Sequence, residues 1–209
     1  KTHDKGNTFK VICQEIYKLG YSIFSDVLNT CEYTKIPQNR ERTFMIAFKD
    51  EVNWRSSPKG TMSSRFDKNF PPQKLNSPNS IKNYLETGEI DDVFYYRQDK
   101  YMYPELRKAM KSQDTLYQWR RKYVRENKSN LCPTLTANMG TGGHNVPLVL
   151  TDDGMRKLTP RECFNFQGYP KSFKFPADMA NSHLYKQSGN SVSVPLIAKL
   201  AKLIKNSIK

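Results

Sequence analysis

Three side chains that can hold an anion alternate along residues 36–42 (IPQNRER). Gln38, Arg40 and Arg42 are separated by single residues, so they share one face if the backbone is extended. A guanidinium group presents planar donors that match a phosphate or the carbonyl edge of a base. The pattern therefore indicates a site for a phosphate or a nucleobase. It also fits the solvated end of a strand, in which Glu41 balances one of the arginines.

A second candidate site lies in residues 184–192 (LYKQSGNSV), which combine a glycine with small polar residues. We interpret this segment as a glycine-polar loop that opens an amphipathic helix. The free N–H groups at a helix N-terminus can bind a carboxylate. Asn190 and Ser191 are therefore candidates for ligand binding. The alternative is an ordinary N-cap by Ser191 or Ser193.

The net charge of the chain is +14. Such a balance favours a polyanionic partner, because lysine and arginine release counterions when they bind phosphates. Residues 117–125 (YQWRRKYVR) interleave aromatic and basic side chains, which suits a nucleic-acid backbone with cations for phosphates and rings for stacking. The same pattern fits a half-exposed strand whose aromatic residues face the core, and the two interpretations are compatible on alternate faces.

Cysteine and histidine usage indicates no metal site. The four cysteines are far apart and the three histidines are scattered, so we expect reduced intracellular thiols and neither a disulfide framework nor a zinc site. Cys163 lies in a predicted amphipathic helix without a neighbouring histidine or lysine, and we interpret it as a buried core thiol. No apolar run approaches the ~18 residues of a membrane span. We expect a cytoplasmic protein, nucleoid-associated if bacterial, whose first residue lies inside a longer product or follows processing.

Two groups of elements would position the candidate residues. At the N-terminus the pattern predicts a helix over 7–18 and strands over 21–28 and 43–48, and the last strand is apolar enough to be buried on both faces of an α/β sheet. A last helix begins near Ser191 or Ser193. Its predicted apolar stripe comprises Val194, Ile197, Ala198, Ala201 and Ile204.

The middle of the chain is less regular. Residues 51–80 are rich in proline, serine and asparagine and form loops, followed by short helices near 80–86 and 104–111. Strands are predicted over 117–125 and 133–138, and a hairpin joins 146–150 to 155–158. Thr159 begins a capping-box helix that ends at Gly168.

In their order along the chain, four segments resemble the C-terminal motifs of DNA (cytosine-5) methyltransferases. They are residues 36–42, 134–137 (TLTA), 159–170 (TPRECFNFQGYP) and 189–192 (GNSV). The resemblance implies an α/β fold: the C-terminal part of a Rossmann-like methyltransferase sheet plus a smaller, irregular α+β target-recognition domain. Residues 1–50 and 189–209 would belong to the catalytic domain, and residues 51–188 to the target-recognition domain.

The resemblance also implies roles for the candidate residues. Gln38, Arg40 and Arg42 would be catalytic, with the arginines holding a flipped cytosine and its phosphates. Asn190 and Ser191 would contact the amino-acid end of the cofactor, S-adenosylmethionine. Thr134 would touch the backbone near the flipped base, while Met139 and its neighbours approach base edges. With the basic segment, the implied DNA-binding residues are Arg120, Arg121, Arg125, Thr134, Thr136, Asn138, Gly140, Gly142 and Gly143.

Three motifs of that family are missing from the sequence: Phe-x-Gly-x-Gly, Pro-Cys and Glu-Asn-Val. The resemblance therefore implies that an N-terminal catalytic half, in the same polypeptide or a separate subunit, supplies the nucleophile and most of the cofactor site. The chain would be inactive alone. With that half, a cytosine of double-stranded DNA would be rotated into a pocket, attacked at C6 by a thiolate and methylated at C5. Restriction–modification is the commonest setting. The alternative is a non-catalytic basic nucleic-acid-binding module.

Overall fold

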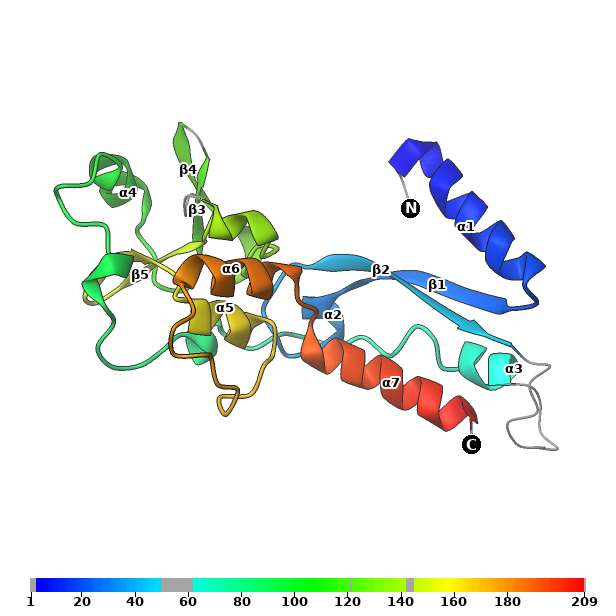
Figure 1. Ribbon diagram of the computed structural model, residues 1–209. Helices are drawn as coiled ribbons and strands as arrows, with labels where there is room; N and C mark the ends of the chain where they lie inside the picture. Colours follow the sequence, from blue (N-terminus) through cyan, green and yellow to red (C-terminus); the bar gives the residue numbers. More distant parts are fainter. Residues whose placement is uncertain (1–2, 50–61, 121, 142–144, 209) are drawn as a thin grey trace.

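The computed structural model describes residues 3–49, 62–120, 122–141 and 145–208. The chain is elongated, with a compact lobe at one end and a long antiparallel hairpin at the other (Figure 1). The hairpin consists of β1 (Ser22–Asn29) and β2 (Glu41–Phe48), paired from Ser22 opposite Phe48 to Asn29 opposite Glu41. Around it lie α1 (Asn7–Lys18), α2 (Thr30–Tyr33), α3 (Met62–Asp67) and α7 (Val194–Ile208).

The helix over 7–18 and the two strands are confirmed, but burial of β2 on both faces is wrong. Residues Glu41 to Thr43 are exposed, and Phe48 is the buried residue of this strand. The reason is that β1 and β2 form a two-stranded sheet in the part of the chain that the structure describes. Phe48 packs against Phe66 of α3 with ring centroids 5.1 Å apart, so this side is covered. On the other face Val27 remains 41% exposed.

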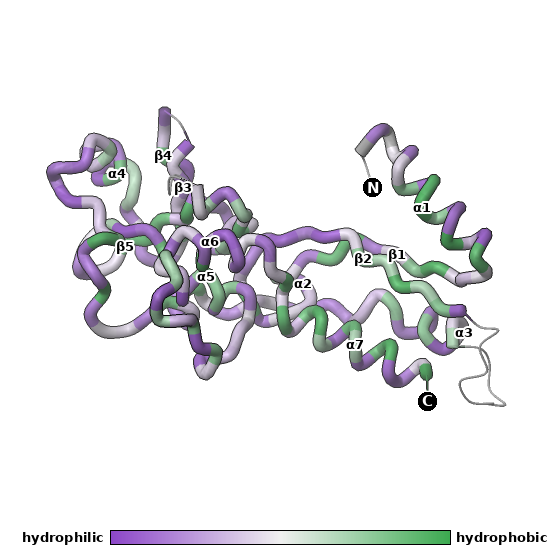
Figure 2. Tube along the Cα trace, viewed as in Figure 1, coloured by the Kyte–Doolittle hydropathy of each residue, from purple (hydrophilic) through white to green (hydrophobic). Residues whose placement is uncertain are grey.

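Helix α7 packs through a different face from the one predicted. Leu196 and Leu200, one turn apart, are buried against Leu28 and Tyr33. Ile197, which belongs to the predicted stripe, is 36% exposed. The helix is apolar on two sides, so periodicity alone did not determine which side packs within the chain. Figure 2 shows further apolar residues along α1 and α7 at this end of the molecule.

Helix α3 packs with the hairpin and α7, although the predicted boundary assigns it to the recognition domain. Besides the Phe66 ring contacts, Nε of Arg65 donates a 2.8 Å hydrogen bond to the Ser207 carbonyl of α7. Aromatic packing therefore places α3 beside the hairpin. The division into two domains and its boundaries stay a prediction.

The lobe is built on a four-stranded antiparallel sheet of order β4-β3-β5-β6. The predicted hairpin over 146–158 is confirmed as β5 (Leu148–Thr151) and β6 (Gly154–Lys157). The single strand expected over 117–125 is wrong: the segment is a hairpin of β3 (Tyr117–Arg120) and β4 (Tyr123–Glu126). The strand expected over 133–138 is absent among the described residues, and Ala137–Gly140 forms a 3-10 turn, η5.

Helices α4 (Tyr103–Ala109), α5 (Pro160–Phe166) and α6 (Asn181–Asn190) complete the lobe. The capping box at Thr159 is confirmed, and Gly168 follows α5 with a φ of 81°. The expectation of a loop over residues 184–192 is wrong in its first part, because this segment is helical as far as Asn190. The segment places Leu184 and Tyr185 in the core, and this burial favours the helix over the polar loop.

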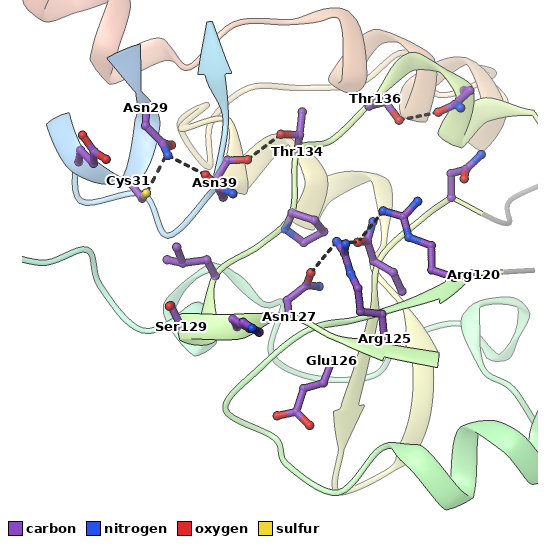
Figure 3. A pocket seen from close by; sticks show the side chains of 17 residues that line it. Asn29, Cys31, Asn39, Arg120, Arg125, Glu126, Asn127, Ser129, Thr134 and Thr136 are labelled. Atoms are coloured by element: carbon purple, nitrogen blue, oxygen red, sulfur yellow. Dashed lines mark hydrogen bonds between the residues drawn. The ribbon is translucent and has the colours of Figure 1, made fainter. Parts of the chain in front are cut away.

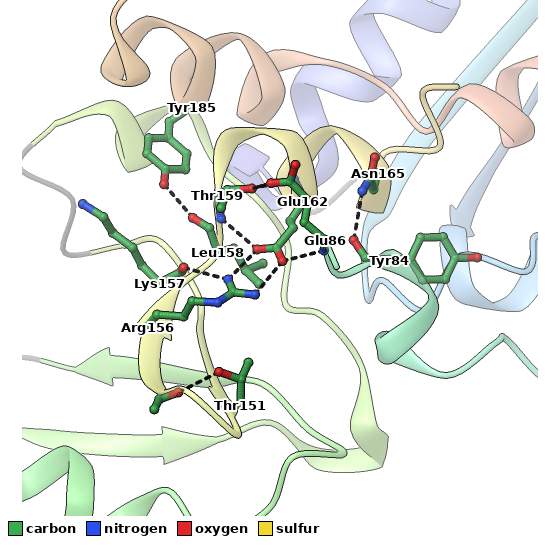
Figure 4. A network of polar contacts seen from close by, with 11 residues as sticks. Tyr84, Glu86, Thr151, Arg156, Lys157, Leu158, Thr159, Glu162, Asn165 and Tyr185 are labelled. Carbon is green, nitrogen blue, oxygen red and sulfur yellow. Dashed lines mark hydrogen bonds and ion pairs between the residues drawn. The ribbon is translucent and has the colours of Figure 1, made fainter. Parts of the chain in front are cut away.

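A buried ion pair joins β6 to α5 (Figure 4). Both Nη atoms of Arg156 donate 2.8 Å hydrogen bonds to the Glu162 carboxylate, which is fully buried. The same carboxylate accepts hydrogen bonds from the backbone N–H groups of Thr159 at 2.8 Å and Glu86 at 2.9 Å. Because two of the partners are backbone N–H groups and the third is a side chain of β6, the network sets the position of α5 relative to the sheet. No described helix is both long and apolar enough to cross a membrane.

Candidate nucleic-acid interface

Arg40 is a buried clamp between three segments. Its side chain donates to the carbonyl oxygens of Leu135 at 2.7 Å, Gly189 at 3.2 Å and Ser191 at 2.6 Å, and the residue is 4% exposed. Burial, and then the charge of Arg42, lower the pKa of Arg40 to about 10, so the group remains charged at neutral pH. Arg40 therefore has a structural role, and because it also lines a cavity with Arg42, its expected role in holding a base or phosphate stays a prediction.

Gln38 is likewise structural. Its side chain is fully buried, and Nε2 donates a 3.1 Å hydrogen bond to the carbonyl of Phe166 at the end of α5. Its backbone forms a parallel bridge with Cys132. Gln38 is not among the residues that line a cavity with Arg40 and Arg42, so the structure does not bring the three side chains together, and a catalytic role for Gln38 stays a prediction.

One small cavity of about 250 Å³ brings together four predicted site residues: Arg40, Arg42, Asn190 and Ser191. Arg42 is exposed, and its Nη1 donates a 2.7 Å hydrogen bond to the carbonyl of Glu41. Asn190 is also exposed, at the end of α6. Phe44 and Leu196 form the apolar part of the cavity wall. The cavity thus pairs an available cation and an amide with apolar surface, a combination that suits a planar polar ligand.

The helix after this cavity does not offer the set of free N–H groups that the sequence suggested. In α7, Val194 donates its N–H to the carbonyl of Gln167 at 2.8 Å, Pro195 has no N–H, and Ile197 donates to Ser193 at 3.0 Å. The Ser191 hydroxyl donates to the Ser188 carbonyl at 2.8 Å. A carboxylate bound here would therefore depend on side chains such as Asn190 more than on the helix terminus.

A larger cleft of about 810 Å³ lies between the lobe and the closed end of the hairpin, where residues 29–39 connect β1 to β2 (Figure 3). It brings together five of the residues predicted to bind DNA. They are Arg120, Arg125, Thr134, Thr136 and Asn138. They come from β3, β4 and the strap over residues 131–138, and the cleft also contains Asn29 and Asn39 from the closed end of the β1–β2 hairpin. Contact of these residues with DNA stays a prediction.

One wall of the cleft is the β3–β4 hairpin. Its two arginines converge on Gln118, whose Oε1 accepts hydrogen bonds from Nη2 of Arg120 at 3.4 Å and from Nη2 of Arg125. Arg125 also donates to Oδ1 of the buried Asn127 at 3.3 Å. Glu126 points the opposite way in Figure 3, so its carboxylate does not neutralise this wall.

The opposite wall is the strap over residues 131–138. Thr134 donates its hydroxyl to the carbonyl of Asn39 at 2.6 Å, which ties the lobe to the hairpin and leaves its oxygen as an acceptor. Thr136 is exposed and donates its hydroxyl to Oδ1 of the exposed Asn138. Asn29 and Asn39 bond to each other at 2.6 Å on the floor. The hydrogen bond of Thr134 thus holds the strap against the hairpin.

Met139 is corrected: it is 1% exposed and belongs to the core, so it does not approach a base edge. Gly140 has a packing reason to be glycine, since a Cβ would lie 2.3 Å from the Ser182 carbonyl of α6. Gly189 faces the strap with the same restriction, because a Cβ there would lie 2.1 Å from the Thr136 carbonyl carbon. Arg121, Gly142 and Gly143 lie outside the described residues.

Cys132 and Cys163 are core thiols, and Cys31 is the cysteine that lines the large cleft. Cys163 is fully buried, as expected, and burial raises its pKa well above the ordinary value. The same holds for Cys132. Cys31 lines the large cleft, and its pKa is raised by burial and then by the charge of Glu32. Among the described residues, no group of three or more histidine, cysteine, aspartate or glutamate side chains could hold a metal ion.

Sequence reasoning missed Gln118, Asn127, Asn29 and Asn39 as cleft residues. The signal for Gln118 was its alternation with Arg120 along a strand, which places both side chains on one face. The turn between β3 and β4 contains no glycine, asparagine or proline, so nothing marked a hairpin. The asparagines are brought to the cleft by contacts between distant segments, for which a single sequence carries no signal.

Comparison with known proteins identifies the class. The model of the C-5 cytosine-specific DNA methylase family matches residues 1–206. The chain belongs to this family. It is 53% identical over 209 residues to the type II methyltransferase M.Bsp6I of Bacillus sp. (strain RFL6), covering 99% of this chain and 62% of that protein. It is 32% identical over 217 residues to the type II methyltransferase M.HhaI of Haemophilus parahaemolyticus, covering 99% of this chain and 60% of the relative.

Solved structures agree on the fold. The crystal structure of the S. pombe Dnmt2 methyltransferase aligns with a TM-score of 0.69 at 14% identity, covering 100% of this chain and 66% of that one. The structure of the Entamoeba histolytica methyltransferase EhMeth aligns with a TM-score of 0.62 at 16% identity, covering 96% of this chain and 58% of that one. The mixed α/β fold is therefore that of a Rossmann-like methyltransferase in part. The chain spans about three fifths of the length of the curated relatives that it matches.

Proposed function

We propose that this chain is the DNA-recognition half of a DNA (cytosine-5) methyltransferase. Joined to an N-terminal half with the cysteine nucleophile, it would transfer a methyl group from S-adenosylmethionine to C5 of a cytosine flipped out of a specific duplex sequence. The family supports the reaction class and the methyl donor. The division of labour between the halves rests on the sequence motifs and on the geometry of the site.

One observation carries the proposal: the large cleft and the small cavity are lined by residues that are adjacent in the chain, so the two lie side by side. Asn29 lines the cleft and Thr30 the cavity, while Asn39 lines the cleft and Arg40 the cavity. A base rotated out of a duplex in the cleft would therefore have a short path into the cavity. Base rotation costs a few kcal/mol, which phosphate contacts of a basic surface can offset.

Within the cavity, Arg42 is the group that can hold the flipped base or its phosphate. Its guanidinium is exposed, whereas that of Arg40 is held by three protein carbonyls. Arg40 acts as a positioning residue that fixes the strap and the end of α6. Asn190 would contact the amino-acid end of S-adenosylmethionine. When bound, that cofactor supplies the methyl group, and the cavity fits only one end of so large a molecule.

The N-terminal half would cover the exposed apolar surface of α1 and α7. No residue of α1 is buried: Val11 and Ile12 are 46% and 43% exposed, and Leu19, directly after the helix, is 65% exposed. Together with Ile197, they give this end of the molecule apolar surface that a second segment can bury. The relatives are longer than this chain and so have such a segment to offer.

A methyl-transfer assay tests the proposal directly. A chimera joins the N-terminal remainder of the Bacillus relative to this chain, and transfer of tritiated methyl from S-adenosylmethionine to duplex DNA is measured. The chimera should transfer methyl groups, and the chain alone should not. The matched control is the chimera with the nucleophilic cysteine of the added segment replaced by serine, which should be inactive.

The alternative, a nucleic-acid-binding module without chemistry, predicts duplex binding by the chain and no methyl transfer by the chimera, and that result would reject the methyltransferase role. The type II methyltransferase names of the relatives support a restriction–modification setting in the cytoplasm, with double-stranded DNA as the partner.

A further inference from the structure

The β3–β4 hairpin divides its side chains between two faces. Gln118 pairs with Arg125 and Arg120 with Tyr123 across the strands, so these four share one face. Tyr123 is 59% exposed on it. The other face carries Tyr117, Trp119 and Val124, which pack into the second core cluster of the lobe. The hairpin is thus anchored on one side and presents a polar side to the large cleft (Figure 3).

Neutral amides hold both arginines of the polar face. Oε1 of Gln118 accepts from Arg120 and Arg125, and Oδ1 of Asn127 accepts from Arg125. Asn127 is itself fixed, because its Nδ2 donates a 3.0 Å hydrogen bond to the Leu116 carbonyl and its N–H donates to the same oxygen at 2.9 Å. In the described part of the chain neither arginine has a carboxylate within ion-pair distance. Arg125 is therefore oriented by two amide oxygens, and the exposed Arg120 is oriented by a longer contact to Gln118 alone.

Orientation distinguishes base reading from phosphate binding. A phosphate attracts a cation from many directions, so a contact to it requires little ordering. A guanine edge requires the guanidinium fork to meet O6 and N7 in one plane. A two-stranded ribbon fits the major groove, and holding the side chains before binding reduces the entropy lost on binding.

We propose that Gln118 is a specificity-determining positioning residue, which orients Arg120 and Arg125 so that they read guanine edges of the target duplex. This inference rests on the proposed function and adds to it the residue that sets base preference. Arg120 and Arg125 make the contacts, and Gln118 acts through them.

The test compares Gln118→Met with Gln98→Met in the active chimera. Gln98 is exposed on another surface of the lobe, so the control makes the same chemical change away from the cleft. Binding is measured on a duplex library randomised at the preferred site, and thermal unfolding confirms that both variants fold. Gln118→Met should lower the preference for guanine at one or two positions by about tenfold. Its affinity for duplexes without the site should stay within about twofold of the parent, as expected for unchanged phosphate contacts.

A second variant separates orientation from charge. Gln118→Glu keeps an oxygen that can accept from both arginines and adds a negative charge, so it should keep the guanine preference while weakening binding to all duplexes. An equal loss by Gln118→Met on every duplex, or no loss at all, would overturn the proposal. A parent chimera without any sequence preference or methyl transfer would instead overturn the proposed function itself.

Discussion

Nη2 of Arg40 donates a 2.6 Å hydrogen bond to the carbonyl oxygen of Ser191. The same guanidinium bonds to the carbonyl of Leu135 at 2.7 Å. One buried side chain therefore joins the start of β2 to the strap of the large cleft and to the segment between α6 and α7. The candidate cofactor residue Asn190 is flanked by two carbonyls that this clamp holds, those of Gly189 and Ser191.

Removal of the clamp should destabilise the protein. Arg40→Met leaves three carbonyls without their partner, and the free energy of unfolding should fall by about 3 kcal/mol or more. Arg42→Ala removes an exposed side chain and should change it by no more than about 0.5 kcal/mol. Urea unfolding of both variants measures the difference. Equal stability of the two variants would show that Arg40 is not a structural residue.

Loss of the ion pair between Arg156 and Glu162 should lower the free energy of unfolding by a similar amount. Glu162→Gln leaves the buried guanidinium without a counter-charge, and we expect a loss of about 3 kcal/mol. Glu105→Gln, on the exposed side of α4, is the matched control and should be nearly neutral. Thermal unfolding of the two variants distinguishes them. A small loss at Glu162 would mean that the charge is not needed to hold α5 on the sheet.

Local signals in the sequence predicted several elements correctly. The capping box of Thr159, the Asp153-Gly154 turn and the helix over 7–18 depend on neighbouring residues, and the structure confirms each of them. Packing decided the rest. Which face of α7 is buried depends on its contact with Leu28 and Tyr33, which lie more than a hundred residues earlier.

The candidate site shows the same limit. The alternation of Gln38, Arg40 and Arg42 was visible in the sequence, but the buried carbonyls that engage Gln38 and Arg40 come from α5, the strap and α6. Those contacts give Gln38 and Arg40 a structural role that the sequence did not predict, whereas Arg42 is exposed. The spacing of the three side chains within residues 36–42 does not show which of them the protein's own carbonyls engage.

Cys31 offers a probe of the large cleft. Its pKa is raised, so the thiolate fraction is low at neutral pH and increases with pH, and alkylation at about pH 8.5 should be slow but measurable. A bound duplex should slow the reaction of Cys31 at least several-fold. Cys13 on α1, remote from the cleft, should react at an unchanged rate. Mass spectrometry of the labelled peptides gives both rates. If DNA leaves the rate at Cys31 unchanged, the duplex does not occupy this cleft.

The most direct test of the central claim is Arg42→Ala in the active chimera, measured for methyl transfer and for duplex binding on the same DNA. Arg107→Ala, on the exposed side of α4, is the control for loss of one positive charge. A cation that holds the flipped base should matter more to the reaction than to the affinity for the duplex. We predict that methyl transfer falls by at least about 100-fold while duplex affinity falls less than about fivefold, with little change for Arg107→Ala. Equal losses of transfer and binding at Arg42 would contradict a flipped-base pocket beside the cleft.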